Sequence, residues 1–118
     1  MVVEDLIGNY SIVGNNQDDE KSVYNGNLNL SLDRNHKIVA KWSIGDHEQM
    51  GIGTFNNNIL VIKFTYTGVD DYVYKGTVVY WCISKDMLDG FWSEKHGNPL
   101  VLGKERCFRI QTPQELLN

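Results

Sequence analysis

The chain has 118 residues, of which 42% are apolar, so it is long enough for one hydrophobic core and too short for two ordinary domains. Fifteen acidic residues against 11 basic ones give a formal charge of −4. No segment concentrates Lys and Arg into the basic patch that nucleic-acid binding requires. We therefore predict a single domain over residues 1–118 and no nucleic-acid partner.

The first ten residues do not have the pattern of an export signal. Glu4 and Asp5 stand where a signal peptide has a basic region followed by an apolar run. No apolar stretch approaches the ~20 residues of a membrane-spanning helix. We expect a soluble chain without a membrane span, cytoplasmic by default, while removal of an earlier leader stays open.

Two-residue alternation of apolar and polar side chains dominates the chain and predicts half-buried strands. The clearest case is residues 24–33, where Tyr24 and three leucines share one face and the asparagines share the other. Residues 37–47 repeat the pattern around Trp42. The predicted strands cover residues 6–14, 22–33, 37–47, 50–56, 59–67, 72–84, 88–95 and 101–111.

The connections between these segments are short and rich in Gly, Asn and Asp, so neighbouring strands should pair as hairpins. An open meander of eight strands would leave two unpaired edges. We therefore predict an all-β fold, a closed eight-stranded antiparallel up-and-down barrel. At the end of the chain, Thr112, Pro113 and Glu115 have the spacing of a helix start and predict a short C-terminal helical turn.

Cofactor and catalytic chemistry have little support in the sequence. There is no G-x-S-x-G motif, and neither Cys82 nor Cys107 has a histidine nearby. We predict two free thiols, because two cysteines are too few for a disulfide framework. The three histidines stand singly, without the spacing of a metal site, so we expect no metal and no cofactor.

Hydroxyl-bearing rings share the inward phase of the predicted strands. An eight-stranded barrel is just wide enough to be filled by its own side chains or to hold one small ligand. The sequence leaves both interpretations open. It also leaves open whether Glu105, Cys107 and Arg109, which share one face of the last strand, point inward or outward. If that phase is inward, Glu105 and Arg109 would form a buried charge pair that anchors a polar ligand group. The ligand-binding candidates are Tyr10, Tyr24, Trp42, Tyr66, Tyr74, Tyr80, Trp92 and Arg109.

The outward phase of the strands predicted at 59–67, 72–84 and 88–95 is apolar where it should be polar. A contiguous apolar patch with a central Trp is typical of a protein interface. A bulge at Gly76 would exchange the faces and turn Trp81 inward instead. The interface candidates are Ile59, Val61, Val79, Trp81, Ile83 and Phe91.

Gly8-Asn9-Tyr10 on the first strand, the meander of eight strands and Arg109 on the last resemble the calycin barrels, which include lipocalins and avidin-like proteins. The resemblance carries over Gly8 and Arg109, whereas Tyr10 stands where lipocalins have Trp. A broader likeness extends from Tyr24-x-Gly26 and Trp42 to Gly103-x-Glu105. It includes Gly51-Ile52-Gly53, Leu60, Val78-Val79-Tyr80 and Leu88-x-Gly90-x-Trp92. In these residues the chain is similar to small bacterial proteins of unassigned function among the lipocalin-like barrels. This resemblance implies a fold but no activity.

We rank first a non-enzymatic barrel that binds a small, partly apolar ligand in its lumen or mouth. The alternative is an interaction module with a solid core that self-associates through its outer wall, as a homodimer or with another protein partner. An enzyme ranks third, because residues distant in sequence can still converge in space.

Overall fold

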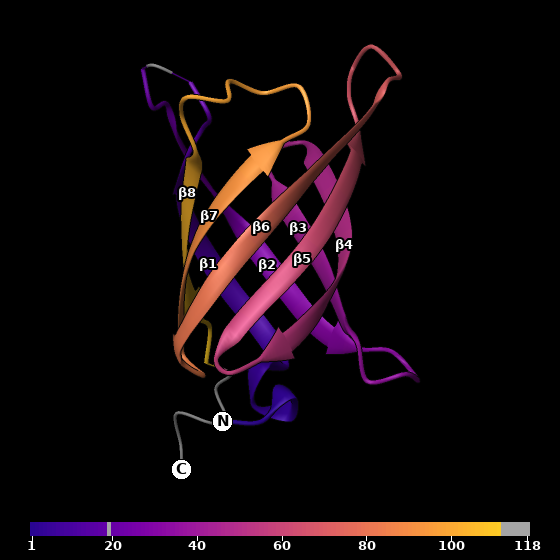
Figure 1. Ribbon diagram of the computed structural model, residues 1–118, viewed down its shortest axis with the longest axis vertical. Coiled ribbons are helices and arrows are strands. Elements are labelled where there is room, and N and C mark those ends of the chain that lie inside the picture. The colour runs from indigo at the N-terminus through magenta and orange to yellow at the C-terminus, as the bar shows by residue number, and fades with distance from the viewer. Residues whose placement is uncertain (19, 112–118) are drawn as a thin grey trace.

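The computed structural model describes residues 1–18 and 20–111, and these form one closed barrel of eight strands (Figure 1). The predicted all-β, antiparallel up-and-down fold is confirmed. No helix in this part of the chain is long and apolar enough to cross a membrane. The predicted helical turn at Thr112, Pro113 and Glu115 lies outside the described residues. The strands are β1 (Gly8–Asn15), β2 (Val23–Leu32), β3 (Ile38–Ile44), β4 (His47–Asn56), β5 (Ile59–Thr67), β6 (Val73–Ser84), β7 (Met87–Glu94) and β8 (Gly103–Arg109).

Each strand pairs with its sequence neighbour, and β1 pairs with β8 to close the barrel. Closure places Tyr10 directly opposite Arg109. The hairpin loops β1–β2, β3–β4, β5–β6 and β7–β8 lie together at one end, which we call the open end (Figure 1). The other end carries the remaining loops and the N-terminal segment, and we call it the closed end.

The predicted inward phase of the strands is the observed one. Apolar side chains of all eight strands alternate into the lumen. In the half of the lumen near the closed end, nearly all of these side chains are fully buried. In β8, the face that holds Glu105 and Cys107 also points inward, because both residues are buried while Phe108 is exposed. A register irregularity occurs in β6 at Cys82 and Ser84, not at Gly76, so Trp81 stays outside.

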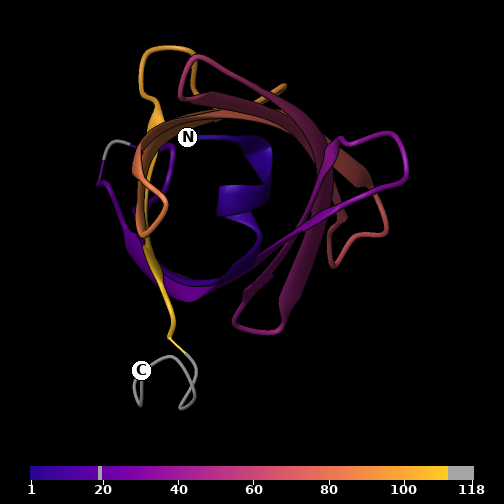
Figure 2. The same ribbon diagram turned by 90° about the horizontal axis from the view of Figure 1, so that it is seen from below.

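One turn of 3-10 helix, η1 (Val3–Leu6), precedes the first strand and corrects its predicted start at residue 6. The Asp5 carboxylate accepts a hydrogen bond from the Val2 amide at 2.9 Å and holds the turn. Leu6 is fully buried in the core. Seen from below, η1 lies across the opening of the barrel (Figure 2). This turn therefore shuts the closed end with an apolar side chain.

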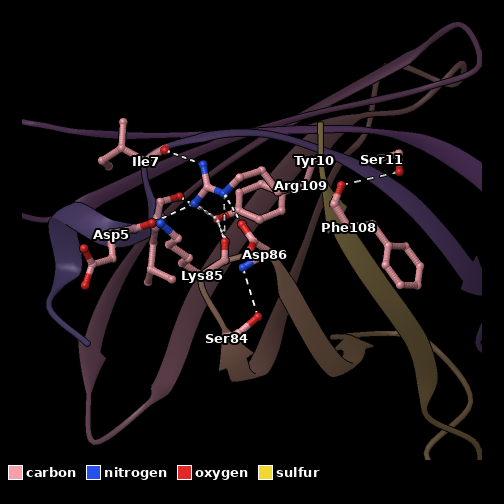
Figure 3. A network of polar contacts seen from close by, with 10 residues as sticks. Asp5, Ile7, Tyr10, Ser11, Ser84, Lys85, Asp86, Phe108 and Arg109 are labelled. Carbon is pink, nitrogen blue, oxygen red and sulfur yellow. Dashed lines mark hydrogen bonds and ion pairs between the residues drawn. The ribbon is translucent and has the colours of Figure 1, made fainter. Parts of the chain in front are cut away.

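Arg109 completes the closure, and this corrects the predicted pair of Arg109 with Glu105. Its Nη1 donates to the Ile7 carbonyl at 2.9 Å, and its Nη2 donates to the Asp5 carbonyl at 2.6 Å (Figure 3). Its Nε donates to the Lys85 carbonyl at 2.9 Å, and its guanidinium lies 4.9 Å from the Tyr10 ring centroid. Arg109 sits here because its register on β8 is at the closed end, whereas Glu105 lies four residues nearer the open end.

Tyr10 and Gly8 fit around this guanidinium. The Tyr10 hydroxyl donates to the Leu6 carbonyl at 2.9 Å and accepts from Arg109 Nη2 at 2.8 Å. Burial raises the pKa of Tyr10 to about 12, against the lowering effect of the Arg109 charge. Gly8 has a φ of 147°, and a Cβ there would collide with Arg109. The two residues carried over by the calycin resemblance thus meet at the closed end.

Cys82 and Cys107 are free and buried, as predicted. Burial raises the pKa of the Cys82 thiol to about 11, so neither exposure nor ionisation favours reaction in the folded protein. We expect a thiol reagent such as dithionitrobenzoate to modify neither cysteine in native protein at neutral pH and both after denaturation. Rapid modification of the native protein would contradict this arrangement.

Candidate functional site

The half of the lumen near the open end is not filled and contains a cavity of about 140 Å³ that is partly open to solvent. A cavity of about 150 Å³ in another protein holds one benzene molecule, so this space suits a ligand built on a single ring. The lining residues come from every strand or from its adjoining loop. They are Asn16, Tyr24, Trp42, Ile44, His47, Gln49, Phe64, Tyr66, Val78, Tyr80, Trp92, Glu94 and Glu105.

The cavity exists because four aromatic rings lie flat against the barrel wall. Each of these rings is directly opposite a glycine of the neighbouring strand, and a Cβ on that glycine would collide with it. Glycine is the one residue that lets a ring approach the neighbouring backbone so closely. The pairs are Tyr24 with Gly14, Phe64 with Gly76, Tyr80 with Gly90 and Trp92 with Gly103. The rings therefore line the lumen instead of plugging it.

The rings also support one another edge to face. Phe64 lies between two indoles, with ring centroids 5.9 Å from Trp42 and 6.5 Å from Trp92. Tyr24 meets Trp92 at 6.4 Å. Such T-shaped pairs are favourable because the positive edge of one ring faces the negative face of the next. The result is a preformed aromatic wall.

Among the buried residues of the described part of the chain, Glu105 is the one charged side chain, with 5% of its surface exposed. Its Oε1 accepts a hydrogen bond from the Tyr24 hydroxyl at 2.8 Å. Its Oε2 accepts from the Tyr80 hydroxyl and, at 3.2 Å, from Trp42 Nε1. The Cys107 thiol is a further, weaker donor at 3.7 Å. Three strands besides its own therefore hold this carboxyl group in place.

Burial has the largest effect on the pKa of the Glu105 carboxyl group. It raises the pKa of Glu105, and the hydrogen bonds from Tyr80 and Tyr24 offset only part of the rise. Burial likewise raises the pKa of Tyr80 and Tyr24, and the Glu105 charge adds to both shifts. The two phenols therefore remain hydroxyl donors at neutral pH. The cavity thus contains a carboxyl group with hydrogen-bond partners and no cation beside it.

Two buried polar atoms of the lining, Gln49 Oε1 and Trp92 Nε1, have no hydrogen-bond partner within residues 1–18 and 20–111. The Trp92 N–H lies close enough to the Tyr24 hydroxyl to lower the pKa of Tyr24, but the contact does not have the geometry of a hydrogen bond. Buried polar groups are nearly always paired, and each one left unpaired costs about 1–3 kcal/mol. An acceptor and a donor without partners in one cavity are consistent with a site that a polar ligand or water completes.

The rim of the cavity is held by contacts between β4, β5 and β7. The Tyr66 hydroxyl donates to Glu94 Oε1 at 2.6 Å, and the His47 ring packs against Tyr66 with centroids 4.2 Å apart. The Glu94 amide donates to Gln17 Oε1 at 3.0 Å, which ties the β1–β2 loop to β7. This end of the barrel is therefore an ordered mouth.

The structure divides the eight ligand-binding candidates between three places. Five of them line the cavity: Tyr24, Trp42, Tyr66, Tyr80 and Trp92. Tyr74 lies outside it at the rim, where its ring stacks on Tyr66 at 5.1 Å and its hydroxyl donates to Asp70 at 2.6 Å. Tyr10 and Arg109 lie at the closed end, in the network already described.

Several lining residues were not among the candidates, although the same alternation places them inward. Phe64, Val78 and Glu94 lie two residues from a candidate on their own strands. Gln49 and His47 precede residue 50, where this strand was expected to start, and they continue the inward alternation of β4. Phe64 and Val78 already lie in the inward phase of the predicted strands, and extending that phase of β4 to the open end would have added Gln49 and His47.

The lining offers little for covalent catalysis. Its described residues include no serine, threonine or cysteine, and its tyrosines have raised pKa values that disfavour a phenolate nucleophile. Its hydroxyl, carboxyl and amide groups are suited to hydrogen bonding.

The sequence matches no family model and no curated protein. Solved structures show the fold clearly. The barrel is similar to a redesigned β-barrel, b11L5F_LGL, with a TM-score of 0.72 and 13% identity over 92% of this chain and 95% of that one. The redesigned barrel mFAP1, in a structure described as bound to DFHBI, gives a TM-score of 0.70 and 16% identity over 91% and 97%.

A natural protein also resembles this barrel. It is a protein of unknown function from the DUF3598 family of Nostoc punctiforme, with a TM-score of 0.54 and 13% identity. The match covers 93% of this chain and 49% of that one. At these identities the likeness shows the fold alone. The class defined here is the small eight-stranded β-barrel with a preformed aromatic cavity at one end.

Proposed function

We propose that this protein is a binding protein for a small, partly apolar molecule, which occupies the cavity at the open end of the barrel. The cavity itself carries the proposal: a space of about 140 Å³ with ring walls held open by glycines, and two lining residues that each have a buried polar atom without a partner among the described residues. Small-molecule sites typically combine apolar walls with a few placed polar groups. The similar barrel mFAP1, described as bound to DFHBI, supports a barrel of this architecture as a ligand-binding protein.

The three tryptophans provide the test. Trp42 and Trp92 line the cavity, whereas Trp81 is on the outer wall and 62% exposed. In 15N-labelled protein titrated with phenol or benzamide, we expect the indole N–H signals of Trp42 and Trp92 to shift with saturation. The Trp81 signal should not move.

A matched pair of variants locates the binding. Val78 is buried and lines the cavity, whereas its neighbour Val79 is on the outer face of the same strand. Val78→Phe should fill the cavity and weaken binding of either probe at least about tenfold, a loss of about 1.4 kcal/mol. Val79→Phe should bind as the wild type does. Unchanged cavity signals with both probes would overturn the proposal, as would equal binding by the two variants.

A second candidate function, self-association, rests on the outer wall. The six interface candidates form an exposed patch on β5, β6 and β7, the outer-wall patch, in which Ile59 is opposite Trp81 and Val79 is opposite both Val61 and Phe91. A patch of this kind is self-complementary in a twofold dimer. We propose a second copy of the chain as its occupant, because a contiguous exposed apolar patch around a Trp is typical of a protein interface.

Sedimentation of the wild type against Trp81→Lys tests this proposal. We expect a dimeric wild type at micromolar concentration and a monomeric, folded variant, because Lys would place a charge at the centre of the outer-wall patch. Val13→Lys, which changes an exposed apolar residue on β1, should remain dimeric. A monomeric wild type would exclude self-association through this surface.

A further inference from the structure

The acidic groups around the cavity outnumber the basic ones. Glu105 and Glu94 contribute carboxyl groups, and Gln49 contributes an acceptor oxygen without a partner. No Lys or Arg is present among the described lining residues, and His47 is the one basic side chain there. The cavity therefore offers two carboxyl groups and an acceptor oxygen, with no Lys or Arg of the described lining beside them.

Glu105 has unused capacity for a ligand. A carboxylate offers about four lone-pair positions. Oε2 has the Tyr80, Trp42 and Cys107 donors, whereas Oε1 has the Tyr24 hydroxyl alone among the described residues. A buried carboxylate attracts a cation far more strongly than an exposed one, because water screens it less. A cationic N–H donor at Oε1 would also balance the charge that burial makes costly.

The walls favour the same kind of ligand. A cation over the face of an aromatic ring is attracted by the negative charge of that face, most strongly with Trp and when water is excluded. Trp42 and Tyr24 donate hydrogen bonds to the carboxyl group, and Trp92 packs against Tyr24 in the same lining. The net charge of −4 adds a long-range attraction for cations.

From this arrangement, and resting on the proposed function, we infer that the ligand is a compact organic cation: a single-ring molecule bearing a protonated amine or amidine. Its N–H groups bind Glu105 Oε1 and Gln49 Oε1, and its ring packs against the aromatic wall. The unpaired Trp92 N–H binds an acceptor atom on the ligand or a retained water. The titratable groups that face Glu105 are Tyr24, Tyr80 and Cys107, with His47, Tyr66 and Glu94 at the rim.

Three probes of one shape and different charge test this inference. Benzamidinium is a cation, benzamide is neutral and benzoate is an anion. Their affinities are measured from the indole N–H signals of Trp42 and Trp92 in the wild type. We expect benzamidinium to bind at least about tenfold more tightly than benzamide, and benzoate to bind most weakly, as hydrogen bonds between charged groups are the stronger ones.

Two variants assign the preference to Glu105. In Glu105→Gln, the ratio of benzamidinium to benzamide affinity should fall toward one. In Glu48→Gln, which removes an exposed charge from the outer face of β4, the ratio should stay at the wild-type value. Should Glu105→Gln fail to fold, the order of the three probe affinities in the wild type still decides whether the cavity prefers a cation.

The outcomes separate this inference from the proposed function. If benzamide binds as tightly as benzamidinium, or benzoate binds best, the cationic class is overturned and the binding function stands. If Glu105→Gln folds and keeps the wild-type ratio, the role of Glu105 is overturned. If none of the three probes moves the cavity signals at millimolar concentration, both the inference and the proposed function fail.

Discussion

Arg109→Ala is expected to lower the free energy of unfolding by about 3 kcal/mol, because it removes several interactions at once. The carbonyls of Asp5, Ile7 and Lys85 each lose their charged donor, and the Tyr10 ring loses the guanidinium above it. The ion pair of Arg109 with Asp86, at 3.1 Å, contributes less because Asp86 is 57% exposed. Urea unfolding followed by circular dichroism measures the loss.

Arg106→Ala is the matched control on the same strand. Arg106 forms an ion pair with Asp89 at 3.3 Å in which both side chains are about half exposed, so its loss should cost at most about 1 kcal/mol. Arg109→Lys should fall between the two, since an ammonium group keeps the charge but not the fork of donors. If Arg109→Ala is no more destabilised than Arg106→Ala, the network does not stabilise the closed end.

The same substitution should loosen η1 in particular. Two of the Arg109 contacts hold the N-terminal segment against the barrel, at the Asp5 and Ile7 carbonyls, and the Tyr10 hydroxyl that Arg109 also contacts donates to the Leu6 carbonyl. Amide hydrogen exchange in residues 3–7 should therefore accelerate more in Arg109→Ala than exchange in β4 or β5. Uniform acceleration across the barrel would mean that Arg109 supports the whole fold and not this segment.

The sequence predicts the face of a side chain well and its height along the barrel poorly. Alternation places Tyr10, Tyr24 and Tyr80 in one inward phase, and all three are inward. Yet Tyr10 lies at the closed end and the other two lie at the cavity, since height depends on register between strands. That register is set by pairings such as Tyr10 with Arg109, which no single strand encodes.

The carboxyl network illustrates the same limit. The donors to Glu105 come from Tyr24, Trp42 and Tyr80, which are 81, 63 and 25 residues away. Nothing in the local pattern around Glu105 indicates those partners. The ring and glycine pairs are a clearer signal in retrospect, because Gly76 and Gly103 are inward residues that leave room for a ring of the neighbouring strand. The sequence-based interpretation considered Gly76 only as the site of a possible bulge and missed that consequence.

The stability of the wild type relative to Glu105→Gln is expected to decrease as pH rises. Because burial holds the pKa of Glu105 above its ordinary value, the folded protein keeps this proton at pH values where the unfolded chain has lost it. The folded state then binds more protons, so the free energy of unfolding falls with rising pH through that window. Below the ordinary range of Glu the contribution is complete, and above the raised pKa it is lost.

Urea unfolding of both proteins at a series of pH values gives this difference directly. Subtracting Glu105→Gln cancels the other titrating groups, and one proton limits the slope to about 1.4 kcal/mol per pH unit. The difference between the wild type and Glu48→Gln should not show this decrease, as that side chain is exposed. A relative stability that instead increases with pH would mean that the hydrogen bonds from Tyr24, Tyr80 and Trp42 outweigh burial, so that the cavity already favours a carboxylate without a ligand.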